Sequence, residues 1–85
     1  MQDRRREPRY PASGTITLIP SDGPSFVANL LDGSENGFRA EYTEPGVRSG
    51  TELLAESAAG KYRVKVAWTV VVAGKSQSGF YRVSD

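Results

Sequence analysis

The side chains best suited to binding chemistry lie in two short segments of the chain. Arg5 and Arg9 are four residues apart in the first segment, and Asp32 and Ser34 precede Gly37 in the second. A guanidinium group is planar and presents paired N–H donors, which suit phosphate oxygens and the edges of purine bases. A carboxylate and a hydroxyl add hydrogen-bond acceptors. These residue types indicate a local site for an anionic ligand.

Catalytic chemistry is poorly supported by the remaining residues. The chain contains no histidine and no cysteine, so a serine nucleophile would lack its usual base. Several acidic residues could form a carboxylate pair, but nothing in the sequence selects one. Asp32, Ser34 and Asn36 also match the start of a calcium-binding loop, yet the twelfth position, which requires glutamate, is Thr43. We therefore predict no enzyme activity, no metal and no cofactor.

Length and composition limit the remaining classes of function. With 85 residues the chain forms one small domain, which favours a shallow surface site over an enclosed cavity. The net charge of +1 is too small for a general nucleic-acid-binding protein. The first residues lack the apolar segment of a secretory signal, and the longest apolar run, 67–73, is too short to cross a bilayer. We expect a cytoplasmic protein with no membrane partner.

The distribution of apolar residues predicts an all-β chain. Polar and apolar positions alternate between clusters of glycine, proline and serine, and no segment has a sustained helical period. The segment 51–57 is the least certain strand, because Glu-Leu-Leu-Ala-Glu also suits one or two helical turns. The six predicted strands span 15–19, 25–31, 38–42, 51–57, 61–72 and about 79–83.

Six short strands joined by hairpin turns suggest a small six-stranded antiparallel β-barrel, because closing the sheet removes its exposed edges. Residues 12–85 are assigned to this barrel. In its longest strand, every second residue from Tyr62 to Val72 is large and apolar, and these residues are expected to share one face. Trp68 lies on that face, so we expect it to pack in the barrel.

The first eleven residues are expected to form a separate, flexible arm. Pro8 stands between Arg5 and Arg9, and a proline there disfavours a helix that begins upstream. An extended or loosely turned segment is therefore predicted for residues 1–11. Such a segment can either fray into solvent or carry its arginines to a ligand.

The arginine pair and the later loop together match a known signature. R-x-x-x-R at Arg5 and Arg9, followed one hairpin later by D-x-S-x-x-G at Asp32, Ser34 and Gly37, resembles the signature of PilZ domains. PilZ domains are bacterial receptors for cyclic di-GMP and are built on a six-stranded antiparallel β-barrel. The resemblance therefore implies the fold that the strand pattern suggests, and it implies a ligand.

The resemblance extends over nearly the whole chain, from about Arg4 to Val83. Trp68 followed by Gly79 and Phe80 resembles the closing strands of the family. Either half of the signature alone is a weak signal, because R-x-x-x-R is common by chance in a basic segment. The two halves in order, within a matching strand pattern, are more specific.

The resemblance implies a contact role for each residue of the signature. Arg5 and Arg9 would bind phosphate oxygens and the O6 and N7 atoms of guanine. Asp32 would accept hydrogen bonds from guanine or orient an arginine, and Ser34 would bind the ligand or the loop backbone. Gly37 would supply a positive φ or allow a close approach of the ligand.

Two further arginines have weaker assignments. Arg4, directly before the motif, resembles the family members that hold an intercalated ligand dimer, which implies two cyclic di-GMP molecules per domain. Arg39 lies beside the loop on the outward face of its strand and is a secondary candidate for ligand binding. A cross-strand salt bridge with a neighbouring acid explains Arg39 equally well.

The favoured interpretation is a stand-alone binding module that orders its arm on cyclic di-GMP and signals to an unidentified partner protein. It requires the arm to lie over Asp32 and Ser34. One alternative is a PilZ-like adaptor that acts only through protein contacts. Another is a small barrel that binds single-stranded nucleic acid, which would need aromatic residues interleaved with basic ones on an exposed face.

Overall fold

A computed structural model of the chain describes residues 10–83. That range contains seven β-strands and no helix, so no helix within it could cross a membrane. The strands are β1 (Tyr10–Pro11), β2 (Thr15–Pro20), β3 (Phe26–Gly33), β4 (Gly37–Tyr42), β5 (Glu52–Ser57), β6 (Gly60–Val72) and β7 (Lys75–Arg82).

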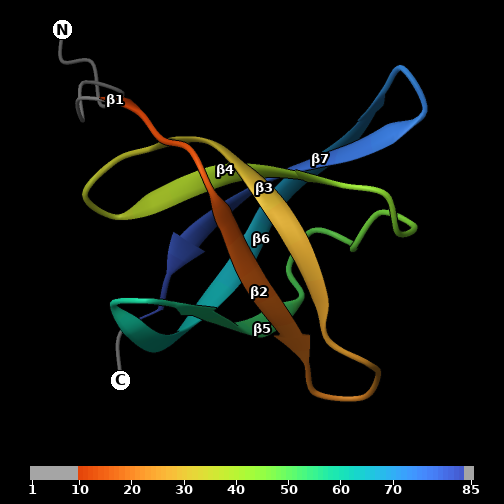
Figure 1. Cartoon of the computed structure of the whole chain (residues 1–85). Coiled ribbons are helices and arrows are strands. Elements are labelled where there is room, and N and C mark those ends of the chain that lie inside the picture. The colour runs from red at the N-terminus through yellow and green to blue at the C-terminus, as the bar shows by residue number, and fades with distance from the viewer. Residues whose placement is uncertain (1–9, 84–85) are drawn as a thin grey trace, which may run out of the picture.

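Six of these strands close into an antiparallel barrel (Figure 1). Neighbouring strands follow the order β3-β2-β5-β6-β7-β4, and a further pairing of β3 with β4 closes the ring. The two-residue strand β1 pairs with the end of β3, beyond the part of β3 that pairs with β2. The predicted six-stranded antiparallel barrel is confirmed, and so is the strand over 51–57, here β5.

The barrel interior is filled by apolar side chains that alternate along each strand. Phe38, Ala40 and Tyr42 of β4 are all buried, as their alternation predicts. Phe38 stacks on Phe80 of β7, with the ring centroids 4.9 Å apart. The other buried apolar residues are Ile16, Leu18, Ala28, Leu53, Ala55, Val64 and Val66.

β6 departs from the predicted alternation halfway along its length. Val66 lies opposite Phe80 of β7, but Trp68 lies opposite Gly79, so Ala67 is an extra residue in β6. Such a β-bulge reverses the face that each following side chain occupies. The expectation that Trp68 packs inside the barrel is therefore wrong. Its side chain lies on the outer surface, and the residue is 37% exposed.

The reversal continues to the end of β6. Thr69 now points inward, where its hydroxyl lies 2.6 Å from the hydroxyl of Ser78. Val70 and Val72 point outward and are exposed. In Figure 1 this end of β6 and the start of β7 form a hairpin that extends past the barrel.

The hairpin between β6 and β7 turns in only two residues. Ala73 and Gly74 have φ angles of 53° and 80°, the left-handed conformation that two-residue hairpins of type I′ require. Because the turn is so short, β7 begins at Lys75. The sequence interpretation had placed the start of this strand near Gly79, four residues too late.

Candidate functional site

The predicted ligand loop, Asp32–Gly37, lies where β3 turns into β4, and we call it the corner. Its first two residues still belong to β3 and pair with β4 on one side. On the other side they pair with β1, Pro11 opposite Asp32 and Tyr10 opposite Gly33. The start of the corner is thus paired on both edges, which holds its backbone in place.

The tip of the corner is tied both to itself and to β7. The N–H of Ser34 donates to the carbonyl oxygen of Gly37 at 2.8 Å, and the N–H of Arg82 donates to the carbonyl oxygen of Asn36 at 2.8 Å. The hydroxyl of Ser34 lies 3.5 Å from the Gly37 oxygen, which is long for an O–H donor. The Ser34 hydroxyl is therefore only weakly engaged in this loop.

Glycine is required at position 37 for a structural reason that the sequence did not reveal. Its φ is not positive, so the first of the two roles expected for it, a left-handed backbone, is wrong. A Cβ atom at this position would lie 2.2 Å from the carbonyl oxygen of Phe80 and 3.3 Å from the Cα of Tyr81. Only glycine lets β4 approach β7 this closely. The close approach of a ligand to Gly37 stays a prediction.

Asp32 and Arg39 form an ion pair across β3 and β4. The Nε and Nη2 atoms of Arg39 donate to Oδ2 of Asp32 at 2.8 and 2.5 Å. These hydrogen bonds, assisted by the charge of Asp32, raise the pKa of Arg39, while partial burial opposes the rise. The side chain of Asp32 is 15% exposed and that of Arg39 43%. Asp32 therefore orients an arginine, and the salt bridge considered for Arg39 is present.

Two β-bulges align this pair with other side chains on the outer surface. Against β4, the register of β3 shifts between Leu30 and Asp32, as that of β6 shifts against β7 at Ala67. Each bulge turns outward a side chain that strict alternation would have placed inside the barrel. The row that results across four strands reads Asp32 of β3, Arg39 of β4, Gly79 of β7 and Trp68 of β6.

A shallow groove of about 220 Å³ runs along this row. The indole of Trp68 lies across Gly79, because a Cβ atom there would be 2.4 Å from the indole nitrogen. Arg39 and Tyr81 also line the groove, as does Ser34 of the corner. The groove thus combines a guanidinium group, a hydroxyl and two aromatic rings on an accessible surface.

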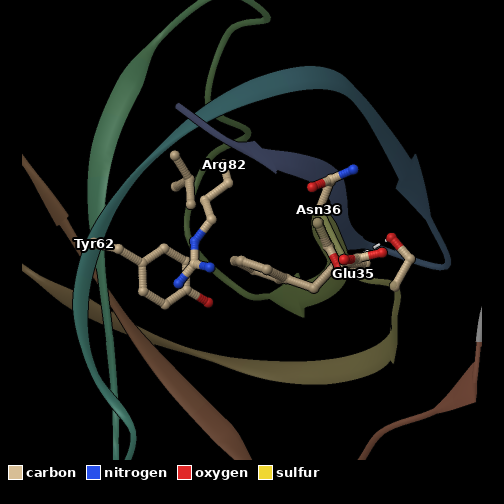
Figure 2. A pocket seen from close by; sticks show the side chains of 8 residues that line it. Glu35, Asn36, Tyr62 and Arg82 are labelled. Atoms are coloured by element: carbon tan, nitrogen blue, oxygen red, sulfur yellow. Dashed lines mark hydrogen bonds between the residues drawn. The ribbon is translucent and has the colours of Figure 1, made fainter. Parts of the chain in front are cut away.

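The corner also borders a second, smaller pocket of about 110 Å³ at one end of the barrel, which we call the mouth pocket (Figure 2). The guanidinium carbon of Arg82 lies 4.2 Å from the centroid of the Tyr62 ring, a cation–π contact. Glu35 and Asn36 line the opposite side of the pocket in Figure 2. The same hairpin therefore borders both the groove and the mouth pocket.

The structure brings together part of the predicted site. Asp32, Ser34 and Gly37 lie in one hairpin, and Arg39 joins them through its ion pair. The predicted ligand-binding residues Arg4, Arg5 and Arg9 lie outside the described residues. Four further residues line the groove or the mouth pocket, and the sequence did not assign them to the site: Trp68, Tyr81, Tyr62 and Arg82.

Nothing in the sequence marks these missed residues directly. Trp68 reaches the surface through a bulge. Tyr81 and Arg82 lie within the predicted last strand, but the sequence does not show which of its residues border a pocket. The one available signal was Gly79, because a glycine inside a strand often indicates the close approach of another group. Here that group is the Trp68 indole.

The groove presents groups that are suited to binding a ligand. Among residues 10–83, no three histidine, cysteine, aspartate or glutamate side chains gather as metal ligands. The groove offers hydrogen-bond donors, one oriented positive charge and flat aromatic surface. Comparisons with protein-family models and with curated proteins find no match for this chain.

Proposed function

We propose that the chain is a PilZ-type receptor for cyclic di-GMP, which acts in the bacterial cytoplasm on an unidentified partner protein. Cyclic di-GMP carries two phosphates and two guanine bases. A site for it needs positive charge, hydrogen-bonding groups for the base edges and flat surfaces for stacking. In this proposal the arginine segment, the corner and the groove supply these three features.

The observation that carries the proposal is the pairing of β1 with the end of β3. Tyr10 lies opposite Gly33, and Arg9 directly precedes Tyr10 in the sequence. Consecutive Cα atoms are about 3.8 Å apart, so the covalent chain keeps Arg9 within one residue of the corner. Arg5 is tethered to the same point by at most about 18 Å of chain. Both guanidinium groups can thus reach a ligand at the corner.

The groove supports the guanine part of the proposal. The partly exposed indole of Trp68 offers a stacking surface beside Arg39, and base–aromatic stacking contributes about 1–3 kcal/mol per base. Arg39 would donate to the O6 and N7 edge of a stacked guanine or to a phosphate. Asp32, whose carboxylate already accepts from Arg39, would position that arginine.

The free energies explain why one arginine would not suffice. Hydrogen bonds to charged groups contribute roughly 1.5–3 kcal/mol each, and micromolar affinity corresponds to about 8 kcal/mol. Ordering a chain segment on a ligand costs roughly 2–5 kcal/mol. Arg5, Arg9 and the groove together can meet this requirement, whereas a single guanidinium group cannot.

Titration calorimetry with cyclic di-GMP tests the proposal on matched arginine variants. Arg5→Ala and Arg9→Ala should each weaken binding by at least about tenfold, since each removes charge-assisted hydrogen bonds. Arg48→Ala is the control, because Arg48 is exposed and lines neither the groove nor the mouth pocket. Unchanged affinity in either Arg5→Ala or Arg9→Ala would overturn the proposal.

The stoichiometry of the same titration tests the role of Arg4. A third guanidinium group could stack on a base and offset the charge of a second ligand molecule. We therefore expect two cyclic di-GMP molecules per chain, and one per chain after Arg4→Ala. Saturation of the unaltered protein at one ligand per chain would exclude the intercalated dimer while leaving the receptor function intact.

Amide chemical shifts distinguish cyclic di-GMP from other anions. Titrations with cyclic di-GMP, GTP and single-stranded RNA should move the amides of residues 4–11, the corner and Trp68 with the first ligand only. Shifts with RNA across a broader sheet face would favour a nucleic-acid-binding barrel. The absence of shifts with all three ligands would favour an adaptor that works through protein contacts.

A further inference from the structure

In the part of the chain that the structure describes, the outer edge of β6 lacks a neighbouring strand beyond its bulge. At Val66 this edge is still paired, since Val66 donates to the carbonyl oxygen of Thr51 at 2.9 Å and accepts from the N–H of Gly50 at 2.7 Å. From Trp68 to Val72, the backbone of β6 pairs with β7 and with no other segment of residues 10–83. Within the described residues, this edge of β6 is therefore unpaired over five residues, although the Thr69 side chain lies against Gly46 and donates to the carbonyl oxygen of Val47.

The side chains of this open edge are unusually apolar. Trp68, Val70, Val71 and Val72 are 37, 47, 71 and 45% exposed. The sequence from Ala67 to Gly74 contains no charged residue and no proline, the residues that commonly protect an edge strand from pairing. An exposed, uncharged edge of β-branched residues favours the addition of another strand.

We propose that the open edge of β6 pairs with the same edge of a second copy of the chain. The two strands would run antiparallel about a twofold axis at Val70. In that register Val70 lies opposite Val70 of the second copy, Thr69 opposite Val71, and Trp68 opposite Val72. Residues of even number share the outer face and Thr69 and Val71 the inner face, so each side chain meets one on its own face.

The sequence of this strand favours a second copy of the chain as the partner. A twofold interface requires a surface that complements itself. When two copies of Trp-Thr-Val-Val-Val pair antiparallel, apolar or β-branched side chains lie opposite each other at every position. No charge opposes a like charge within the five paired residues. Such cross-strand pairs stabilise an antiparallel sheet.

The size of the edge predicts a weak dimer. A dimer built on four partly exposed side chains per copy would bury far less surface than the roughly 1,200–2,000 Å² of a stable interface. The dimer should therefore form reversibly, with the chain monomeric at about 10 µM and substantially dimeric at about 1 mM.

Sedimentation experiments on two oppositely charged variants test both the dimer and its register. Val70→Lys and Val70→Glu should each remain monomeric at about 1 mM, because the twofold axis places like charges directly opposite each other. An equimolar mixture of the two variants should recover the dimer, since lysine then faces glutamate. Val70 is exposed, so both variants should retain the circular dichroism spectrum of the unaltered chain.

Val27→Lys provides the matched control. Val27 is 57% exposed on β3, away from the proposed edge, so this variant should dimerise like the unaltered chain. A monomeric unaltered chain at about 1 mM, or an unchanged dimer in Val70→Lys, would overturn the proposal. A mixture that stays monomeric would exclude the twofold axis at Val70.

The proposal stands apart from the cyclic di-GMP proposal and can fail separately. Val70 does not line the groove, so Val70→Lys should bind cyclic di-GMP with unchanged affinity per chain. Trp68 borders both the groove and the edge, and it is therefore left unaltered in these experiments.

Discussion

Two hairpins of the barrel, β3–β4 and β6–β7, differ in how their surroundings constrain them. At the corner, β3 ends between β1 and β4, and the turn is bonded to the backbone of Arg82. At the other hairpin, β6 pairs on one side only and ends in the left-handed turn Ala73-Gly74. In the view of Figure 1 the two turns lie on opposite sides of the molecule. The turn of the corner is bonded to another strand, whereas the Ala73-Gly74 turn uses left-handed backbone angles, and other segments of residues 10–83 contact this second hairpin only from Ser76 of β7 onward and at Thr69 of β6.

Both hairpins contain a β-bulge, and the two bulges have different consequences. Each hairpin contains a bulge in its first strand, at Leu31 in β3 and at Ala67 in β6. At the corner the bulge turns Asp32 outward, where Arg39 neutralises its charge. In β6 the bulge turns Trp68 outward, where its indole lies across Gly79. The bulges thus build the groove from both sides, and the second one also leaves apolar residues exposed.

Gly37→Ala should produce the largest loss of stability. The new Cβ would meet a backbone oxygen at 2.2 Å, which cannot rotate away, so β4 and β7 must separate. We expect a loss of roughly 2–3 kcal/mol in the free energy of unfolding, measured with urea. Gly23→Ala is the control, with no atom within 4 Å of its Cβ and a change within about 0.5 kcal/mol. Equal stability of the two variants would contradict the tight contact at Gly37.

Gly79→Ala should have a smaller effect on stability and a clear effect on Trp68. Its Cβ would overlap the indole at 2.4 Å, but a partly exposed side chain can move aside. We expect a loss of about 1 kcal/mol and a red shift of tryptophan fluorescence, because the displaced ring becomes more hydrated. Trp68 is the only tryptophan, so the signal is unambiguous. An unchanged emission spectrum would argue against the packing of Trp68 on Gly79.

Arg39→Gln should cost less, about 0.5–1 kcal/mol, because the ion pair with Asp32 is partly exposed and screened by solvent. The raised pKa keeps Arg39 charged at every pH below its ordinary value, so this contribution should persist across the neutral range. The control is Arg63→Gln, whose carboxylate contact with Glu52 is longer, at 3.9 Å, and more exposed. A larger loss of stability in Arg63→Gln than in Arg39→Gln would contradict the expectation that the Asp32–Arg39 pair contributes more than the Glu52–Arg63 pair.

The sequence predicts the barrel well because the signals for it, alternation within strands and turn residues between them, are local and recur along the chain. Alternation in the β4 segment correctly places Phe38, Ala40 and Tyr42 in the core, and the turn clusters place five of the six barrel strands within about two residues at each end. The closing pair β3–β4 follows from the need to remove sheet edges. Each of these inferences needs only the residues of one strand and its neighbours.

The site was predicted less completely because it depends on strand register. A bulge adds one residue without changing composition, so the sequence gives no sign that Trp68 leaves the inward face at Ala67. The role of Gly37 depends on the backbone of β7, forty residues away in the chain. By contrast, the placement of Asp32 and Ser34 in one loop follows directly from their spacing in the sequence.

Ala73→Asn should change stability by no more than Arg39→Gln does, and the change should be a gain. Ala73 is the only residue other than glycine with a positive φ in the described chain, and a left-handed alanine costs about 1 kcal/mol. Asparagine tolerates this conformation and is favoured in type I′ turns, so we expect about 0.5–1 kcal/mol of added stability. Ala58→Asn, at an exposed turn position without a positive φ, should give no such gain. The contrast tests whether the β6–β7 turn depends on local geometry, because contacts from other strands, like those that hold the corner, would make both substitutions neutral or harmful.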